Sequence, residues 1–329
     1  MRFNFGGRLG RTVLASLACL AGATAHAQTW PTRPITMIVP LPPGGAVDIL
    51  ARVIAEPMQA ALGQPVLVDN VAGAGSSIGV DRAARATPDG YTLGFGTWAN
   101  YVIAGAVYPV RYDVLRDLEP VGLVADAPYW IVARNSMPAA NMAELLSWLK
   151  SNPDKATAGT VGAGSGAHIC GVYLQTEAHV KFQMAPYRGG APALQDLMGG
   201  QIDFMCDLGA NTLPMVRGGQ IKSYAVMAKK RWSAAPDTPT IEEMGLPGLY
   251  LSAWSGIWAP RGTPREAIAK LNAALGKALA DPAIRQKLAG LGQEPFPETM
   301  SSPEALGAFH KAEVEKWFPI VKAANIKVE

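Results

Sequence analysis

The sequence alternates short apolar runs with stretches of helical spacing, and this alternation constrains the fold more than any other feature. Three of the apolar runs end in a glycine-rich turn that leads directly into a predicted helix. These pairs of run and turn are 35–40 with 41–48, 66–70 with 71–77, and 158–161 with 162–168. Short strands that alternate with helices favour a parallel sheet with right-handed crossover connections. Because the pattern occurs in both halves of the chain, the sequence predicts an α/β protein with two lobes, each a mostly parallel sheet flanked by helices.

Hydrophobic periodicity indicates where each element should lie. Strands are predicted at 35–40, 66–70, 91–97, 130–133, 157–161, 181–186, 202–206 and 224–227. Helices are predicted at 47–62, 78–86, 142–149, 167–178 and 191–197. Two further helix starts combine a capping residue with a proline at the first helical position, at Thr263-Pro264 and at Ser302-Pro303.

The segment 118–124 lies between the two α/β units, and we expect the chain to cross there from one lobe to the other. The helices after residue 260 have no obvious sheet of their own, so we expect them to pack on the first lobe. The predicted division is therefore 28–127 plus 251–329 for a discontinuous first lobe, and 128–250 for the second lobe.

The first 27 residues predict a secretory signal peptide that is removed after export. Three arginines precede a stretch of apolar and small residues, and Ala25-His26-Ala27 is a typical cleavage signal before Gln28. The apolar stretch is shorter than the roughly 20 residues that span a bilayer. We therefore expect a mature protein in the periplasm rather than a membrane-anchored one.

Removal of this segment leaves the mature chain with no net charge. Lys+Arg falls from 29 to 26 because three arginines are lost, and Asp+Glu stays at 26. No run of lysine and arginine remains, which excludes a nucleic-acid partner on electrostatic grounds.

Cysteine and histidine are too few and too scattered for a metal centre. Only Cys170 and Cys206 remain in the mature chain, too few for a disulfide framework or a thiolate site. A single bridge between them is open, but two buried free thiols are the favoured interpretation. His168, His179 and His310 show no ligand spacing, so we expect no metal and no cofactor.

A set of motifs spans the mature chain in one characteristic order. They are Trp30-Pro31-Thr32-Arg33-Pro34-Ile35, the turn 39–45 with Asp48, Pro88-Asp89-Gly90-Tyr91-Thr92-Leu93, Pro186-Tyr187-Arg188-Gly189, the segment 196–201, Pro236-Asp237-Thr238-Pro239-Thr240, the segment 254–260 and the segment 311–317. With them the chain resembles the substrate-binding proteins of tripartite tricarboxylate transporters, often called Bug receptors.

The resemblance implies a two-lobed periplasmic-binding-protein fold whose lobes close on a ligand in the cleft between them. It also implies that the ligand is a small organic carboxylate, delivered to the membrane permease subunits of a tripartite tricarboxylate transporter, although some members act as sensors. We expect a monomer without enzymatic activity.

The candidate binding residues lie in the glycine-rich turns and at nearby strand ends. They are Pro43, Gly44, Gly45, Ala46, Asp48, Ser76, Ser77, Thr97, Asn100, Gly164, Ser165, His168, Arg188, Gly189 and Asp207. A helix N-terminus presents unpaired backbone N–H groups to an anion, so the turns would hold the carboxylate mainly through backbone groups, hydroxyls and water. Helix stabilisation is the favoured role of Asp48, and a purely capping role for Ser165 stays open. Arg188 is explained equally well as a surface residue.

The turn 162–168 also calls for two enzyme hypotheses. It partly matches a dinucleotide-binding fingerprint, but no acidic residue that could hold a ribose follows the next strand. It lacks the glycines that flank the nucleophile of an α/β-hydrolase, because residues 163 and 167 are alanine. Ser165 and His168 could still meet at the helix start, so a periplasmic hydrolase that uses them is the alternative function.

Overall fold

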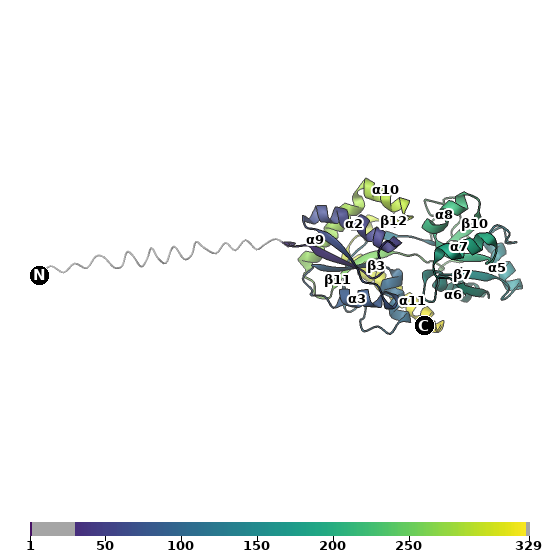
Figure 1. Ribbon diagram of the computed structural model, residues 1–329, viewed down its shortest axis with the longest axis horizontal. Coiled ribbons are helices and arrows are strands. Elements are labelled where there is room, and N and C mark those ends of the chain that lie inside the picture. The colour runs from purple at the N-terminus through teal and green to yellow at the C-terminus, as the bar shows by residue number, and fades with distance from the viewer. Residues whose placement is uncertain (2–29, 327–329) are drawn as a thin grey trace.

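The chain forms two α/β lobes that lie side by side, each built on one five-stranded sheet (Figure 1). The computed structural model describes Met1 and residues 30–326. The predicted signal peptide, Met1 apart, and its cleavage site therefore lie outside the described residues. Within 30–326, no helix is both long enough and apolar enough to cross a bilayer. The predicted two-lobed α/β fold is confirmed.

The first sheet has the strand order β2-β1-β3-β11-β4. Its strands are β1 (Ile35–Val39), β2 (Val66–Asn70), β3 (Thr92–Thr97), β4 (Leu118–Leu123) and β11 (Ser255–Pro260). β1 pairs in parallel with β2 and β3, whereas β11 runs antiparallel to both of its neighbours. Four of the five strands therefore point the same way, and the reversed one is the strand that returns from the far half of the sequence.

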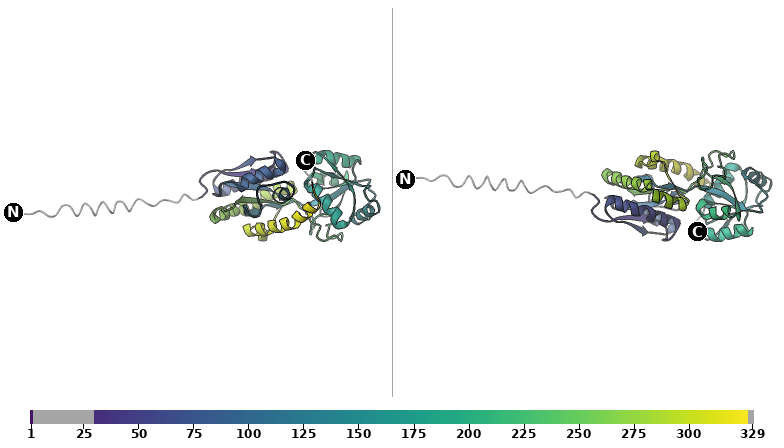
Figure 2. Two further views of the ribbon diagram at one scale, coloured as in Figure 1. Left: turned by 90° about the horizontal axis from the view of Figure 1, so that it is seen from below. Right: turned by 90° about the horizontal axis from the view of Figure 1, so that it is seen from above.

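Helices cover both faces of this sheet (Figure 2). α2 (Ala46–Leu62), α9 (Arg265–Ala280) and α10 (Pro282–Gly290) pack together on one face. α3 (Ser77–Ala84), the π-helical turn η2 (Ala99–Ile103), α4 (Ala104–Val107) and α11 (Pro303–Ala323) lie on the other. The expectation that the late helices pack on the first lobe is confirmed.

Helix capping agrees with the sequence at one of the two predicted starts. Ser302 caps α11 by accepting a hydrogen bond from the backbone N–H of Ala305. Thr263 does not cap α9, because its hydroxyl donates to the Pro260 carbonyl and Pro264 takes the capping position.

The second sheet has the strand order β10-β6-β9-β7-β8. Its strands are β6 (Tyr129–Arg134), β7 (Thr157–Thr160), β8 (Gln183–Pro186), β9 (Phe204–Leu208) and β10 (Ile221–Val226). β7 is parallel to β8 and β9, and β6 is antiparallel to β9 and β10, so one strand is again reversed. α5 (Met142–Ser151) and α6 (Gly166–Ala178) cover one face, and α7 (Gly190–Gly199) and α8 (Gly209–Arg217) cover the other.

Two segments carry the chain between the lobes. The position predicted for the first of them from the sequence is wrong. Residues 118–124 were expected to cross, but Leu118–Leu123 form β4 in the first sheet, Val124 still bonds to Ser255 of β11, and the crossing begins only after Val124. In the sequence β4 resembles a linker, because no predicted helix directly precedes or follows it as in the other strand–helix units. The returning segment pairs with the crossing, since Ala253 N donates to Ala127 O at 2.8 Å and Tyr129 N to Leu251 O at 3.1 Å.

Two further contacts join the lobes beside these crossings. The rings of Trp317 on α11 and Tyr173 on α6 lie 4.9 Å apart between centroids. On the opposite side, Glu294 of the short strand β12 (Glu294–Pro295) accepts a hydrogen bond from the backbone of Ser233 in the second lobe. β12 itself pairs with β5 (Ala125–Asp126) in the crossing. How the chain divides into moving bodies, 28–127 plus 251–329 and 128–250, stays a prediction.

The cysteine expectation is wrong, because Cys170 and Cys206 form a disulfide with their Cα atoms 6.2 Å apart. Cys206 lies on the face of β9 that packs against α6, and Cys170 lies on the facing side of that helix. A separation of 36 residues does not reveal this proximity, which arises only when the helix packs on the sheet.

Candidate ligand-binding site

The predicted binding residues lie at or beyond the carboxyl ends of strands in both sheets, and the second-lobe group packs on α4 of the first lobe. The turn 162–165 follows β7 of the second lobe, and Val107 ends α4 of the first lobe. A Cβ atom on Gly164 would lie 3.4 Å from Cγ1 of Val107. The second-lobe turn therefore packs directly on the first lobe, at the edge where ligands bind in open α/β sheets.

The first-lobe turn, 41–48, is held by a side chain from its own helix. Asp48 is 3% exposed, and its Oδ2 accepts the backbone N–H of Gly44 at 2.8 Å. Arg52 and the Asn70 amide donate to the same carboxylate. The hydrogen bond from Arg52 is the main reason why the pKa of Asp48 lies below its usual value. Asp48 therefore has the structural role that the sequence favoured, and the Gly44 N–H is already occupied.

Gly45 has a backbone conformation that any residue can adopt. Its φ is −79°, so this position does not need the conformational freedom of glycine, whereas Gly44 has a φ of +81°. A Cβ atom on Gly45 would meet only the Pro42 carbonyl, at 3.8 Å. Pro43, Gly44, Gly45 and Ala46 are exposed, and Gly45 is the N-cap of α2 without a capping side chain.

A buried polar network connects three other predicted residues of the first lobe, Ser76, Thr97 and Asn100. Asn100 accepts hydrogen bonds from the backbone and hydroxyl of Thr97 at 2.9 and 3.1 Å, and its amide donates to Ser76 Oγ at 2.9 Å. Ser76 has a φ of +78°, a strained conformation for a residue other than glycine, and such strain is frequent at functional sites. Ser77, the next residue, is the first of α3.

The second-lobe turn repeats the internal hydrogen bond of the first. Gly164 N donates to Nδ1 of His168 at 3.0 Å, and Ser165 Oγ caps α6 by accepting the His168 N–H at 3.2 Å. Burial lowers the pKa of His168, so its ring is neutral at neutral pH. The described contacts couple neither Ser165 Oγ to the imidazole nor Nδ1 to a hydroxyl. A nucleophile and base pair, as the hydrolase alternative requires, is not formed here.

The remaining predicted residues differ in their surroundings. Arg188 is exposed in the turn between β8 and α7, and Gly189 is the N-cap of α7. Asp207 lies near the end of β9, where its side chain is 6% exposed. This burial raises the pKa of its carboxyl group to about 6. Its Oδ1 accepts the Leu208 N–H at 2.8 Å and the Asn211 amide at 3.1 Å, while its buried Oδ2 has no hydrogen-bond partner among the described residues.

One residue that the sequence did not single out also lies at this edge. Tyr129 begins β6, and its hydroxyl occupies the space that a Cβ on Gly166 would fill at the start of α6. Burial and the nearby Asp207 carboxylate both raise the pKa of Tyr129. Nothing in the local pattern could have revealed this, because Tyr129 directly precedes the predicted apolar strand 130–133 and carries no sign of its distant neighbours.

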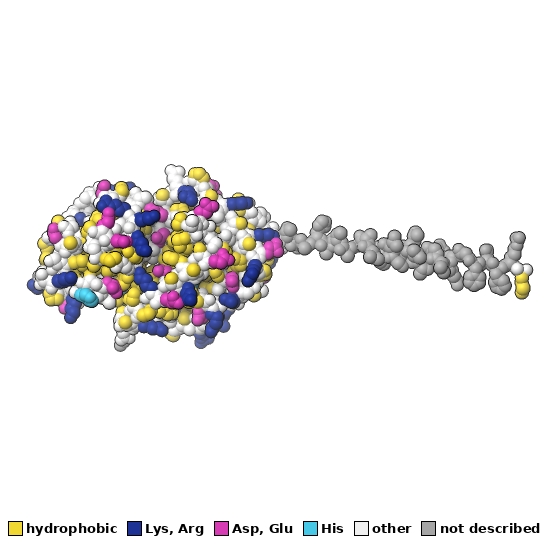
Figure 3. Space-filling model, turned by 180° about the vertical axis from the view of Figure 1, so that it is seen from behind, with side chains coloured by type: hydrophobic (Ala, Val, Ile, Leu, Met, Phe, Trp, Pro, Cys, Tyr) yellow, Lys and Arg dark blue, Asp and Glu magenta, His cyan; other side chains and the backbone are white. Residues whose placement is uncertain are grey.

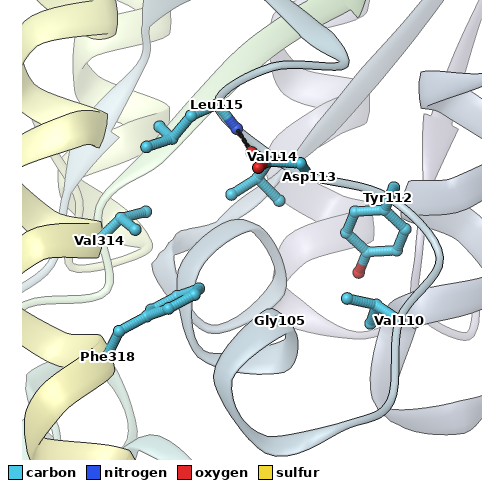
Figure 4. A pocket seen from close by; sticks show the side chains of 8 residues that line it. All are labelled: Gly105, Val110, Tyr112, Asp113, Val114, Leu115, Val314 and Phe318. Atoms are coloured by element: carbon cyan, nitrogen blue, oxygen red, sulfur yellow. Dashed lines mark hydrogen bonds between the residues drawn. The ribbon is translucent and has the colours of Figure 1, made fainter.

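A separate cavity lies in the first lobe, away from these residues. Figure 4 shows a cavity of about 170 Å³ between the loop that carries Val110–Leu115 and two side chains of α11, Val314 and Phe318. None of the predicted binding residues lines it. On the face shown in Figure 3, basic and acidic side chains are intermixed rather than gathered into one basic cluster. Among the described residues, no three His, Cys, Asp or Glu side chains are grouped so that they could hold a metal ion.

Comparisons with known proteins agree with this architecture. Residues 50–326 match the family described as "Tripartite tricarboxylate transporter family receptor". A curated relative from Agrobacterium vitis, "UPF0065 protein in the TAR-I ttuE-ttuC' intergenic region", is 38% identical over 95% of this chain and 90% of its own length.

Two solved structures are similar over nearly the whole fold. The periplasmic binding protein BugD has 39% identity and a TM-score of 0.74, covering 91% of this chain and 100% of its own. MatC from Rhodopseudomonas palustris, with bound malate, has 36% identity and a TM-score of 0.75, covering 89% of this chain and 100% of its own.

Proposed function

From the premise that this chain belongs to the tripartite tricarboxylate transporter receptor family, we propose that it is a periplasmic receptor for a small organic carboxylate. Its structural relatives are binding proteins, and one of them holds malate. The ligand would lie between the lobes, beyond the carboxyl ends of the strands. The receptor would deliver it to the permease subunits of a tripartite tricarboxylate transporter or report its presence as a sensor.

The observation that carries the proposal is the packing of the second-lobe turn on the first lobe. Gly164, directly before the capped start of α6, faces Val107 of the first lobe. A carboxylate at this helix start would gain from the unpaired N–H groups and the helix dipole while touching both lobes. Because such a ligand interacts with both lobes only when they are together, its binding would favour the closed state.

Backbone and hydroxyl groups, rather than arginine, would hold the ligand. Arg188 is exposed, whereas the helix starts at Gly45, Ser77 and Ser165 offer N–H groups and hydroxyls. Water molecules can bridge remaining gaps at little energetic cost, which would let one scaffold accept related acids.

A thermal-shift screen of organic acids on the mature protein tests the proposal. A ligand at about 100 times its dissociation constant should raise the free energy of unfolding by roughly 2.7 kcal/mol. The bound acid should be recovered chemically unchanged after incubation, since the receptor does no chemistry on it. If no mono-, di- or tricarboxylate and no aromatic acid shifts the transition, the proposal is wrong.

A further inference from the structure

Asp207 has one oxygen in use and one oxygen free. Oδ1 holds the start of α8 through the Leu208 N–H and the Asn211 amide. Oδ2 is buried, and within Met1 and residues 30–326 it has no hydrogen-bond partner. Holding the start of α8 therefore uses only the first oxygen. An acceptor left unpaired in the interior destabilises the protein, and a hydrogen-bond donor on a suitable ligand would remove this cost.

The position of Asp207 connects this oxygen to the proposed ligand site. β9 lies between β6 and β7 in the second sheet, and its carboxyl end adjoins the start of β6. Tyr129 at that start pairs with Leu208, the residue after Asp207, and the Tyr129 hydroxyl lies against Gly166. Asp207, Tyr129 and the first turn of α6 therefore share one edge of the sheet.

The charge of Asp207 restricts which acid can lie beside it. Its pKa of about 6 leaves the carboxylate mostly ionised at pH 7. A second carboxylate close by would be repelled unless the ligand also offers a hydrogen-bond donor. A hydroxyl or ammonium group on the ligand removes the repulsion and satisfies Oδ2 with a strong, charge-assisted hydrogen bond.

Resting on the proposed function, we propose that Asp207 selects carboxylic acids that carry a hydroxyl or amino group, which bonds to its free Oδ2. Unsubstituted acids of the same skeleton leave this oxygen unpaired. A hydrogen bond to a charged group corresponds to a preference on the order of 10- to 100-fold for the substituted acid.

The test is calorimetry with matched sets of acids on the mature protein. The sets are propionate, lactate and alanine; succinate, malate and aspartate; and glutarate, 2-hydroxyglutarate and glutamate. In the set that fits the site, the hydroxy or amino acid should bind at least tenfold more tightly than the unsubstituted acid. The two kinds of substituted acid show whether a hydroxyl or an ammonium group is the donor.

The variant Asp207→Asn tests the contribution of Asp207 Oδ2 to this preference. Its Oδ1 keeps the bonds to Leu208 and Asn211, while an NH₂ group replaces Oδ2 and faces the ligand's donor. The preference should fall to less than threefold, with the unfolding transition checked first. Asp207→Ser, which also removes the charge, should show the same loss and replaces the first variant if that one does not fold. Asp237→Asn removes an exposed carboxylate of the same lobe and should leave every affinity unchanged.

The outcomes separate this inference from the proposed function. If the wild-type protein binds the unsubstituted acids as tightly as the substituted ones, or if a folded Asp207 variant keeps the preference, the inference is overturned while the receptor function stands. If no acid of any kind binds, both are overturned.

Discussion

The two glycine-rich turns that begin α2 and α6 are built alike but differ in charge. In each, a glycine with positive φ donates its N–H to the side chain four residues later, Gly44 to Asp48 and Gly164 to His168. The first acceptor is an ionised carboxylate neutralised by Arg52, and the second is a neutral imidazole. The same backbone design therefore leaves the second-lobe turn free of negative charge. We expect it to be the better anion site, and the first-lobe turn to act mainly as a structural element.

The largest expected effect is on ligand affinity, and it distinguishes the two turns because only the second-lobe turn contacts the other lobe. Gly164→Val should weaken binding of the ligand by more than about 100-fold, because the branched side chain meets Val107 and prevents the lobes from closing. Gly44→Val is the matched control. It carries similar backbone strain, about 1–2 kcal/mol, but none of the described residues lies within 4 Å of its Cβ. Calorimetry on both variants checks this; equal losses of affinity would show that the Val107 contact does not matter.

The second comparison is of the two side chains that hold the turns. Asp48→Ala should lower the free energy of unfolding by about 2–3 kcal/mol, since it removes bonds from Gly44, Arg52 and Asn70 to a charged group. His168→Ala should cost only about 1 kcal/mol, because one neutral hydrogen bond is lost. Urea unfolding of the two variants measures the difference. A larger cost for His168→Ala would mean that the two turns are not held in the way described.

Acid should weaken the two turns in different pH ranges. The folded pKa of His168 lies below its unfolded value of about 6.5, so its contribution is complete above that pH and is lost as pH falls below it. The folded pKa of Asp48 is also lowered, so its contribution is lost only below about pH 4. Unfolding free energies between pH 7 and 5 should therefore depend on pH less in His168→Gln than in the wild type.

A control is needed in that range, because burial also lowers the pKa of His310, to about 4. The difference between His168→Gln and the wild type removes the contribution of His310, which both proteins share. An identical pH profile in the two proteins would contradict the assignment to His168.

The smallest expected effect concerns the N-caps. Ser165 caps α6 with its hydroxyl, whereas Gly45 caps α2 with no side chain. Ser165→Ala should destabilise the protein by about 1 kcal/mol. Gly45→Ser should stabilise it by a few tenths of a kcal/mol, since its backbone is already compatible with a side chain. Thermal unfolding measures both changes, and destabilisation by Gly45→Ser would show that this turn needs glycine for another reason.

The order of strands and helices could be predicted because hydrophobic periodicity is a local signal. β2 (Val66–Asn70) and the start of β1 at Ile35 agree with the expected bounds. β9 was placed two residues too early, since its apolar start, Ile202, precedes the first paired residue, Phe204. β4 was taken for a linker because the strand that pairs with it, β11, lies more than 130 residues later.

The candidate site was predictable only as a set of turns. Glycine followed by a helix start indicates where N–H groups are exposed, which placed Gly44, Gly45, Gly164 and Ser165 correctly at helix starts. The sequence could not tell that the Gly44 N–H is already bonded to Asp48. Whether a polar group is free or satisfied depends on neighbours that the fold brings near.

By itself, the sequence determined the α/β class, the two lobes and the family, since these follow from periodicity and from motifs read along the chain. The tertiary structure alone decided that Cys170 and Cys206 are bonded, that Gly164 meets Val107, and that one oxygen of Asp207 stays unpaired. Each of these depends on which residues distant in sequence come within a few ångströms of each other. Such proximity is set by the packing of helices on sheets and of one lobe on the other, and local residue patterns carry no record of it.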